Sequence, residues 1–386
     1  MQLPRLLFGV VLARCPVENA GHTCATMNWA LAFRELGWDV WITEHVTREE
    51  CSDPDESGVS LQERFWRETA LEFGFEGREC LLVDGEASEL SAMRDFARGA
   101  QLFLNYSGQF RMFDLIPDSV PKAYLDLDPA FTQLWAESCG VDMNFAGHDL
   151  FLTIGMNVHG VSAKYPHAGQ PWIPVRPPVA ARSWRERLGV TGPEPLPGAD
   201  AAWTTVGHWY GYHDLPWEGR IYGGKRHSFL EIQPLPGQLR WPVAVATDLQ
   251  PEWGDDTAQF QNDGWQFVPT HEACRTVPAY LNFIRSSRGE IGIAKQGYLE
   301  SQCGWVSDRS LCYLAMGRPV VLHDTGWPHQ LPSNRGLIPF SGLQGAVAAI
   351  ESVEREYEAH AAAAWQLAES TFSPEETLRP WLETLL

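Results

Sequence analysis

The stretch GEIGIAKQGYLESQCGWVSDRSLCYLAMGRPVVLHDTG, residues 289–326, constrains the fold of this chain more than any other. Its apolar run at 291–294 predicts a buried strand that ends at Lys295. A loop of small and polar residues should follow, and LCYLAM predicts a short helix that Ser307 or Asp308 caps and Gly317 ends. A second apolar strand, PVVLHDTG, comes next. This order of elements indicates an α/β protein that presents the N–H groups of a helix N-terminus to an anion, such as a nucleotide diphosphate. Many such units bind nothing, so the layout alone leaves the function open.

Length and composition indicate two globular domains. The chain has 386 residues, of which 44% are hydrophobic and 20% charged, enough for two separate cores. Seventeen Trp residues hint at an aromatic or sugar acceptor, although domain packing explains most of them. The eight Cys form no CxxC pair, which favours free buried thiols over a metal site.

The charge balance argues against two classes of partner. A formal net charge of −20 disfavours nucleic acid and an anionic membrane surface, even with the basic run Lys225-Arg226-His227. The N-terminal apolar segment is too short to span a membrane and lacks a signal-peptide cleavage site. We therefore expect a cytoplasmic protein with no membrane span.

The first residues predict a βαβ unit. Residues 6–13 should form a strand, 23–36 a helix and 38–43 a second strand, which is half of a nucleotide-binding fold. The GxGxxG fingerprint is missing, because Gly21 is the single glycine of the turn. Glu44 occupies the position of a ribose-binding carboxylate, a weak match that keeps an NAD-dependent dehydrogenase among the alternatives.

The remaining pattern continues this alternation. Residues 47–79 read as an insertion, either variable surface or a lid over an acceptor site, with a helix from Leu61. The Pro-rich segment 172–179 predicts an interdomain linker, and a second domain should start near Ala201. Strands are predicted at 81–84, 102–105, 123–125, 149–155, 241–247 and 265–268, and helices at 276–286, 346–370 and 374–386.

The C-terminal third resembles the donor-binding region of glycosyltransferases with the two-domain GT-B fold. QCGWVS looks like the HCGW box of nucleotide-sugar transferases, although the spacing from Trp305 to the glycine of GRPVV is longer by two residues. The GW-S-RS core and the later DTG are closest to bacterial spore-maturation-like (CgeB-like) glycosyltransferases. The resemblance covers the C-terminal third well, the N-terminal quarter moderately and the middle poorly. It implies two Rossmann-like domains that face each other across a cleft: 1–175 for the acceptor, 176–370 for the nucleotide sugar, and a helix at 371–386 that packs back on the first.

The same resemblance, joined to local chemistry, implies a donor site. The N-terminus of the helix after Ser307 would face the diphosphate of a UDP-, dTDP- or GDP-sugar, with Lys295 or Arg309 adding positive charge. Asp324 and Thr325 would hold sugar hydroxyls. No cofactor beyond this co-substrate and no metal is expected, because GT-B enzymes normally work without one. The expected donor-binding residues are Gly207, Lys225, Lys295, Gly304, Trp305, Ser307, Arg309, Ser310, Asp324 and Thr325.

AGHTCATMNWALAFRELGWDV resembles the opening of inverting GT-B enzymes, in which a histidine at the start of the first helix is the general base. His22 matches it, and imidazole has a pKa near the working pH. The DxDP sequence at Asp126 and Asp128 resembles a motif of the same group, and one carboxylate could hold the imidazolium; an Asp-Pro turn with a helix cap explains one Asp but not both. Asn19, Gly21 and Ser107 are the expected acceptor-binding residues.

These observations predict a glycosyltransferase that acts on a small-molecule or natural-product acceptor. Inversion is favoured because the positions of the two glutamates of many retaining enzymes hold Gly304 and Cys312. The alternatives are a sugar epimerase, a nucleobase- or DNA-modifying glycosyltransferase and a non-catalytic sugar-binding protein. The sequence leaves a homodimer, the sugar and the acceptor open.

Overall fold

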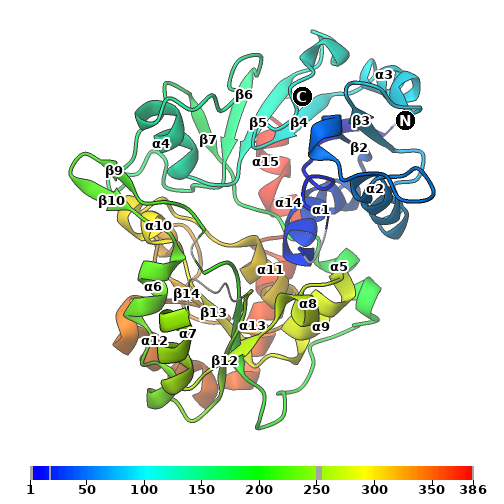
Figure 1. Cartoon of the computed structure of the whole chain (residues 1–386). Helices are drawn as coiled ribbons and strands as arrows, with labels where there is room; N and C mark the ends of the chain where they lie inside the picture. The colour runs from blue at the N-terminus through cyan, green and yellow to red at the C-terminus, as the bar shows by residue number, and fades with distance from the viewer. Residues whose placement is uncertain (1–2, 17–18, 210, 249–253, 385–386) are drawn as a thin grey trace.

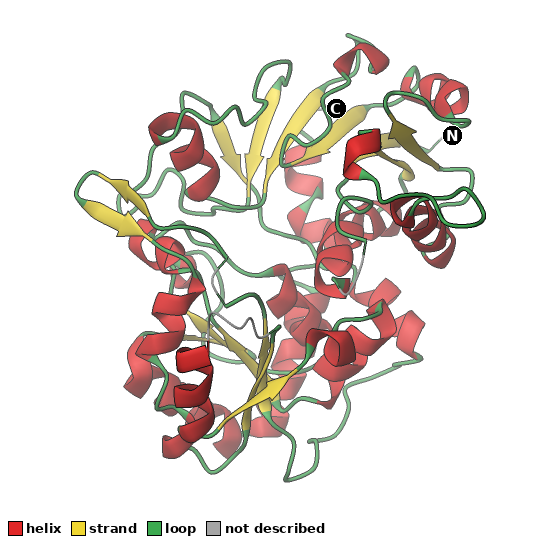
Figure 2. Cartoon of the chain, in the orientation of Figure 1, coloured by secondary structure: helices red, strands yellow, loops and turns green. Residues whose placement is uncertain are grey.

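The computed structural model describes residues 3–16, 19–209, 211–248 and 254–384. These residues form two α/β domains, each built on a parallel sheet with helices on both of its faces (Figures 1 and 2). Among the described helices, none is both long enough and apolar enough to cross a membrane.

The first sheet, in the described part of the chain, has seven parallel strands in the order β3-β2-β1-β4-β5-β6-β7. Phe8 in β1 lies opposite Ile42 on one side and Leu104 on the other. Successive side chains alternate between the faces, so Leu6 and Phe8 join one apolar cluster and Leu7 another. The strands are β1 (Arg5–Gly9), β2 (Asp39–Val46), β3 (Glu79–Val83), β4 (Leu102–Tyr106), β5 (Lys122–Asp126), β6 (Leu150–Thr153) and β7 (Trp172–Pro174).

Helices cover both faces of this sheet. Met27 and Leu31 of α1 pack in one cluster, and Met93 and Phe96 of α3 pack in the other. A capping box at Ser60 begins α2, since the Ser60 side chain accepts from the Glu63 N–H and Glu63 reaches back to the Ser60 N–H. The helices are α1 (Ala20–Glu35), α2 (Leu61–Glu72), α3 (Leu90–Ala97) and α4 (Phe131–Ser138). The next helix, α5 (Ala181–Leu188), contacts α9 and α11 of the second domain.

The second sheet has six described strands, all parallel, in the order β12-β11-β8-β13-β14-β15. A separate antiparallel hairpin, β9 with β10, follows β8. Its turn places Glu218 and Gly219 at positive φ, a tight two-residue connection that the sequence reading missed. The strands are β8 (Trp203–Val206), β9 (Leu215–Trp217), β10 (Arg220–Tyr222), β11 (Val243–Ala246), β12 (Trp265–Val268), β13 (Gly289–Gly292), β14 (Val320–His323) and β15 (Leu337–Phe340).

Ten helices of the described residues belong to this second half. Val321 faces a cluster with Phe229 of α6 and Ile350 of α12, whereas Val320 and Leu322 face the cluster that contains α9 and α11. The last two helices lie beside α1 at the first domain (Figure 1), where Trp381 meets the ring of Phe33 edge-on. The helices are α6 (Lys225–Glu231), α7 (Gly254–Asn262), α8 (Thr270–Ala273), α9 (Val277–Ser286), α10 (Gln296–Ser301), α11 (Asp308–Ala315), α12 (Gly342–Arg355), α13 (Tyr357–Glu369), α14 (Pro374–Thr377) and α15 (Arg379–Leu382).

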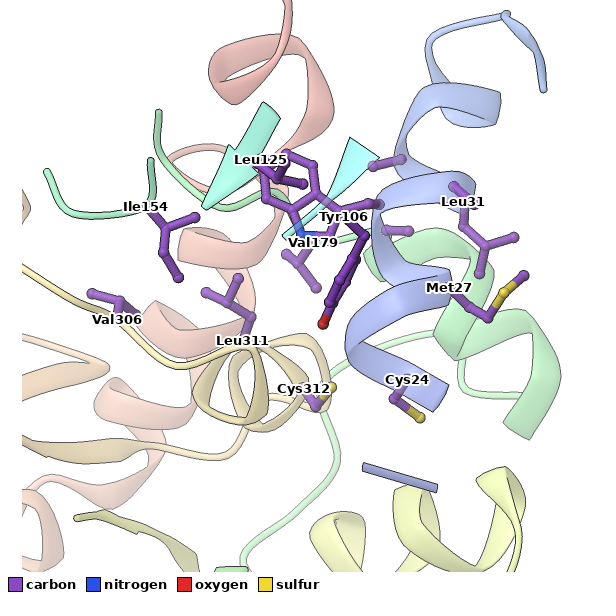
Figure 3. Packing of buried hydrophobic residues seen from close by; sticks show 14 of the residues in the cluster. Cys24, Met27, Leu31, Tyr106, Leu125, Ile154, Val179, Val306, Leu311 and Cys312 are labelled. Carbon is purple, nitrogen blue, oxygen red and sulfur yellow. The ribbon is translucent and has the colours of Figure 1, made fainter. Parts of the chain in front are cut away.

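One apolar core runs through both domains. Figure 3 shows Cys24, Met27 and Leu31 of α1 on one side and Leu311 and Cys312 of α11 on the other. All five side chains are buried in the same cluster. The domains therefore meet through packed helices.

Several predicted elements are corrected by the structure. The helix predicted at 374–386 is, among the described residues, two short helices, α14 and α15, and the loop predicted after Lys295 contains α10. The strand predicted at 6–13 pairs only as far as Gly9, among the described residues. The linker predicted at 172–179 begins with β7, a short edge strand, where proline is tolerated because one side of the strand makes no ladder. The helix predicted at 346–370 is broken at Glu356, between Val353 of α12 and Tyr357 of α13, which are buried in the same cluster.

The tryptophans largely serve packing. Trp29, Trp172, Trp184, Trp203, Trp209 and Trp327 are among the largest fully buried side chains. Trp172 and Trp209 are therefore inaccessible to a ligand ring.

Asn28 joins α1 to the segment between the two sheets. Its Nδ2 donates to the Pro178 carbonyl at 2.6 Å, and its Oδ1 accepts from the Ala180 N–H and the Trp184 Nε1–H, each at 2.9 Å. We expect Asn28→Ala to lower the free energy of unfolding by about 3 kcal/mol or more, because it leaves three buried polar groups without partners. Urea unfolding measures this. The exposed Asn262→Ala is the control, with an expected change within about 0.5 kcal/mol; a loss below about 1 kcal/mol for Asn28→Ala would contradict the assignment.

Candidate active site

A cavity of about 450 Å³ lies where the two sheets face each other. In the second sheet β8 and β13 are neighbours, and the chain leaves them in opposite directions, so a crevice opens at their carboxyl ends. The start of α1 closes this crevice from the first domain. Six residues predicted from the sequence line the cavity: Asn19, Gly21, His22, Gly207, Ser307 and Arg309.

His22 is held in a defined tautomer. Its Nε2 lies 2.7 Å from the Val11 carbonyl oxygen. A carbonyl can only accept, so Nε2 carries the proton and Nδ1 has a free lone pair. Burial lowers the pKa of His22 from its ordinary value of 6.5, although the Val11 carbonyl opposes this shift. At neutral pH the ring is therefore an uncharged proton acceptor.

The turn before α1 is organised by a carboxylate. Glu44 Oε2 accepts from the N–H groups of Leu12 and Ala13, each at 2.7 Å, and Oε1 accepts from the Arg14 N–H at 3.3 Å. Burial raises the pKa of Glu44 to about 7, against the effect of these bonds. A dinucleotide fold offers such N–H groups to a pyrophosphate and such a carboxylate to a ribose. Here they satisfy each other, so the ribose-binding role considered for Glu44 is wrong.

The N-terminus of α11 forms the opposite wall. Ser307 caps it, with its side chain accepting from the Arg309 N–H at 3.2 Å. Arg309 is anchored from below: Nε donates to the buried Glu290 on β13, and Nη1 donates to the Val206 carbonyl at 2.6 Å. Arg309 Nη2, Glu290 Oε2 and Ser310 Oγ are buried without a partner in the described structure.

Lys225 stands beside this wall. An ideal Cβ built on Gly207 would lie 2.6 Å from Lys225 Nζ, so the missing side chain of Gly207 makes room for the amine. Burial, together with the positive charges of Arg309 and Lys295, lowers the pKa of Lys225 well below its ordinary value. Within the described residues, the side chain of Lys225 has no hydrogen-bond or ion-pair partner. An anion in the crevice would supply one.

Asp308 is a second titrating group in the cavity wall. Burial raises its pKa to about 7, and its Oδ1 is buried without a partner among the described residues. Near neutrality this carboxyl is partly protonated.

Several residues that line the cavity are not predicted from the sequence. Asp248 and Thr270 follow β11 and β12, and Asp248 Oδ1 accepts from the Thr270 N–H at 3.3 Å. Their position after parallel strands was the available signal, because those strand ends share one edge of the sheet. The lining residues not chosen from sequence are Ala25, Val206, His208, Asp248, Thr270, Cys274, Tyr280 and Asp308.

The two aspartates of DxDP do not contact His22. Asp126 is fully buried: it accepts from the Thr132 and Thr153 hydroxyls, each at 2.7 Å, and from the Gln133 amide at 2.9 Å. Desolvation raises its pKa. The expectation that one of these carboxylates holds the imidazolium is therefore wrong, and Asp126 stabilises the end of β5.

Asp128 joins the two domains. Lys295 Nζ lies 2.8 Å from Asp128 Oδ2 and 2.9 Å from Oδ1, and Tyr212 and Tyr298 donate their hydroxyls to the same carboxylate. Lys295 also lies 3.8 Å from the centroid of the Tyr212 ring. The side chain predicted to hold a diphosphate is thus paired across the domain interface.

The HCGW-like loop also serves the interface. A Cβ on Gly304, whose φ is +79°, would lie 2.9 Å from the Asn157 nitrogen. Asn157 comes from the first domain and donates its side-chain amide to the Gly326 carbonyl at 2.9 Å. Thr325 donates to the Trp305 carbonyl at 2.8 Å, and Asp324 accepts from the Gly326 N–H at 2.8 Å. The predicted residues that do not line the cavity are Ser107, Asp126, Asp128, Lys225, Lys295, Gly304, Trp305, Ser310, Asp324 and Thr325.

The described residues contain no group of three or more His, Cys, Asp or Glu side chains placed to hold a metal ion.

Comparisons with known proteins identify the fold. No protein-family model and no curated protein matches the sequence. Anabaena Alr3699/HepE in complex with UDP and glucose is 11% identical over 99% of this chain and 99% of that one, with a TM-score of 0.53. Its complex with UDP-glucose gives 12% identity, 99% of each chain and a TM-score of 0.53, and the apo structure of OtsA gives 9%, 99% of this chain, 98% of that one and 0.51. At these identities the likeness concerns the fold. The chain has the GT-B fold predicted from its sequence.

The raised pKa of Asp308 predicts a pH-dependent anion affinity. Below about pH 7 the carboxyl is neutral, and above it a negative charge faces the cavity. We expect the ratio of pyrophosphate affinities, wild type to Asp308→Asn, to fall roughly tenfold, about 1.4 kcal/mol, between pH 6 and pH 8. Isothermal titration calorimetry measures the affinity of each protein for pyrophosphate at each pH. Taking the ratio of the two affinities cancels the effect of protonation of pyrophosphate itself. A ratio independent of pH would contradict the role of Asp308.

Proposed function

We propose that this protein is a glycosyltransferase that moves a sugar from a nucleoside-diphosphate sugar to a hydroxyl group of a small-molecule or natural-product acceptor. The observation that carries the proposal is the cavity between the domains. On one wall it has a neutral histidine with a free Nδ1, and on the other a capped helix N-terminus with Arg309. The amine of Lys225 lies next to Gly207, which lines the cavity.

The donor diphosphate would lie against α11. Its negative charge suits the N–H groups of the first helical turn, and it would give Lys225 the partner that the described residues do not provide. Arg309 adds positive charge and is held in place by Glu290 and Val206. The HepE complexes contain UDP or UDP-glucose, which makes uridine nucleotides the first donors to test. The QCGWVS and DRS residues support a relationship with the spore-maturation-like group.

The reaction would be a single displacement. The acceptor oxygen attacks the anomeric carbon as His22 Nδ1 takes the hydroxyl proton. The bond from the anomeric carbon to the phosphate oxygen breaks, and its electron pair leaves with the nucleoside diphosphate. Attack from the face opposite the leaving group inverts the anomeric centre. The Val11 carbonyl then stabilises the imidazolium through Nε2–H.

Donor binding is tested by thermal shift with UDP-, dTDP- and GDP-sugars, the free nucleotides and NAD. We expect one nucleotide family to raise the melting temperature of the wild type, since the ligand binds the folded state. Lys225→Met should lose most of that shift while the unliganded protein stays folded, because the change removes the amine of a half-buried side chain without a partner. Arg309→Ala is a poorer probe, since it leaves Glu290 buried and unpaired.

The matched control is Lys164→Met, an exposed lysine outside the cavity, which should shift as the wild type does. If NAD alone raises the melting temperature, or if none of these ligands does, the proposal is contradicted.

The general base is tested by kinetics. We expect His22→Ala to lower kcat by roughly 10²–10⁴ while the thermal shift with the donor is kept. At saturating donor, kcat/KM of the wild type for the acceptor should be flat above pH 7 and fall only below pH 6.5, because burial lowers the pKa of His22 and the neutral ring is the active form. The saturating donor removes the pH-dependent anion affinity that Asp308 introduces. The exposed His329→Ala is the control. Full activity of His22→Ala would reject this base.

A further inference from the structure

A second cavity, of about 320 Å³, lies on the other side of the α1 N-terminus. It is enclosed by the start of α1, one face of α2 and the residues that lead into α9. Its volume is within the range of about 300–1,000 Å³ that small-molecule sites occupy.

The two cavities are neighbours. Asn19 lines both of them, and the consecutive residues Cys274 and Arg275 line the first and the second. Asn19 occupies the N-cap position of α1, but its side chain makes no capping bond. Its amide therefore remains available to a ligand at the border between the two cavities.

Helix α2 turns a continuous face toward the second cavity. The lining residues recur with helical spacing, and Phe65 is half-buried near the middle of the run. Val277 adds apolar surface from the opposite wall. The α2 residues that line the cavity are Leu61, Arg64, Phe65, Glu68, Thr69 and Glu72.

Two charged side chains in this cavity are available to a ligand. Two other charged side chains of the lining already have partners: Arg64 is paired with Asp55 at 2.7 Å, and Glu72 lies 3.8 Å from Arg187. By contrast, neither Glu68 nor Arg275 has a hydrogen-bond or ion-pair partner in the described part of the chain. The cavity thus offers an acceptor and a donor of hydrogen bonds beside a partly exposed aromatic ring.

This combination fits a sugar ring. The C–H face of a pyranose can lie on an aromatic side chain, and its hydroxyls both donate and accept. Glu68 would accept from one hydroxyl, and Arg275 would donate to another. The lining has two carboxylates, of Glu68 and Glu72, and two guanidinium groups, of Arg64 and Arg275, so its charges balance and a neutral occupant suits it.

We propose that the second cavity binds one sugar ring of the acceptor, next to the ring whose hydroxyl reacts at His22. The acceptor is then an oligosaccharide or a glycoside with at least two rings. This inference rests on the proposed glycosyltransferase function and deepens it by naming the acceptor class.

The test uses neutral disaccharides of glucose, galactose and N-acetylglucosamine, each beside its monosaccharide, with UDP present. Calorimetry or saturation-transfer NMR should show at least one disaccharide binding tenfold or more tightly than its monosaccharide. Phe65→Ala and Glu68→Ala should each remove that difference, because one deletes the aromatic face and the other deletes the hydrogen-bond acceptor. Leu71→Ala, a change on α2 at a side chain that is 60% exposed and outside the cavity, should preserve it.

The outcomes separate the two proposals. If UDP raises the melting temperature but no disaccharide is preferred, or if the preference survives in both variants, the second cavity is not a sugar subsite and the transferase proposal stands. If a disaccharide binds but no nucleotide does, the transferase proposal fails and a sugar-binding protein remains. Glu68→Ala, a change at an exposed position, keeps the test valid if Phe65→Ala does not fold.

Discussion

The packing of α1 against α11 is the contact on which the rest of this structure depends. Cys24 and Met27 on one helix and Leu311 and Cys312 on the other are buried in one apolar cluster that continues into both sheets. Because this core is shared, the carboxyl ends of the two sheets are held facing each other, and the start of α1 and the start of α11 become opposite walls of one cavity. The base and the anion site are thus positioned by burial of apolar surface rather than by direct bonds between them.

Polar contacts across the interface add orientation to this packing. The Asp128 carboxylate accepts hydrogen bonds from one lysine and from two tyrosine hydroxyls of the second domain. Asn157 of the first domain contacts the loop at Gly304 and donates to the Gly326 carbonyl. Each is a polar group taken from water, so each requires a partner of matching geometry. These contacts use residues of the kind that binds phosphates and sugars, which explains why a motif resembling a donor loop is here part of the interface.

Two carboxyl groups with the same raised pKa have different roles in the structure. Burial raises the pKa of both Glu44 and Asp308 to about 7. Glu44 is satisfied by three backbone N–H groups and fixes the turn before α1. Asp308 keeps an oxygen without a partner in the described structure and lines the cavity, so its charge is felt by whatever binds there.

By itself the sequence determined the local elements: apolar runs that became β13 and β14, the cap at Ser307, and a histidine at the start of the first helix. These depend on neighbours a few residues away, as do most strands and helices predicted here. Only the tertiary structure decided which polar side chains face the cavity and which pair with another residue, because the pairing residue is remote in sequence. Lys295, for example, forms its ion pair with Asp128, which is 167 residues away. The same holds for the break at Glu356, where no glycine or proline marks the helix end and packing on either side sets it. Spacing along a chain describes contacts within one element, whereas desolvation and pairing of charges depend on which elements the folded core brings together.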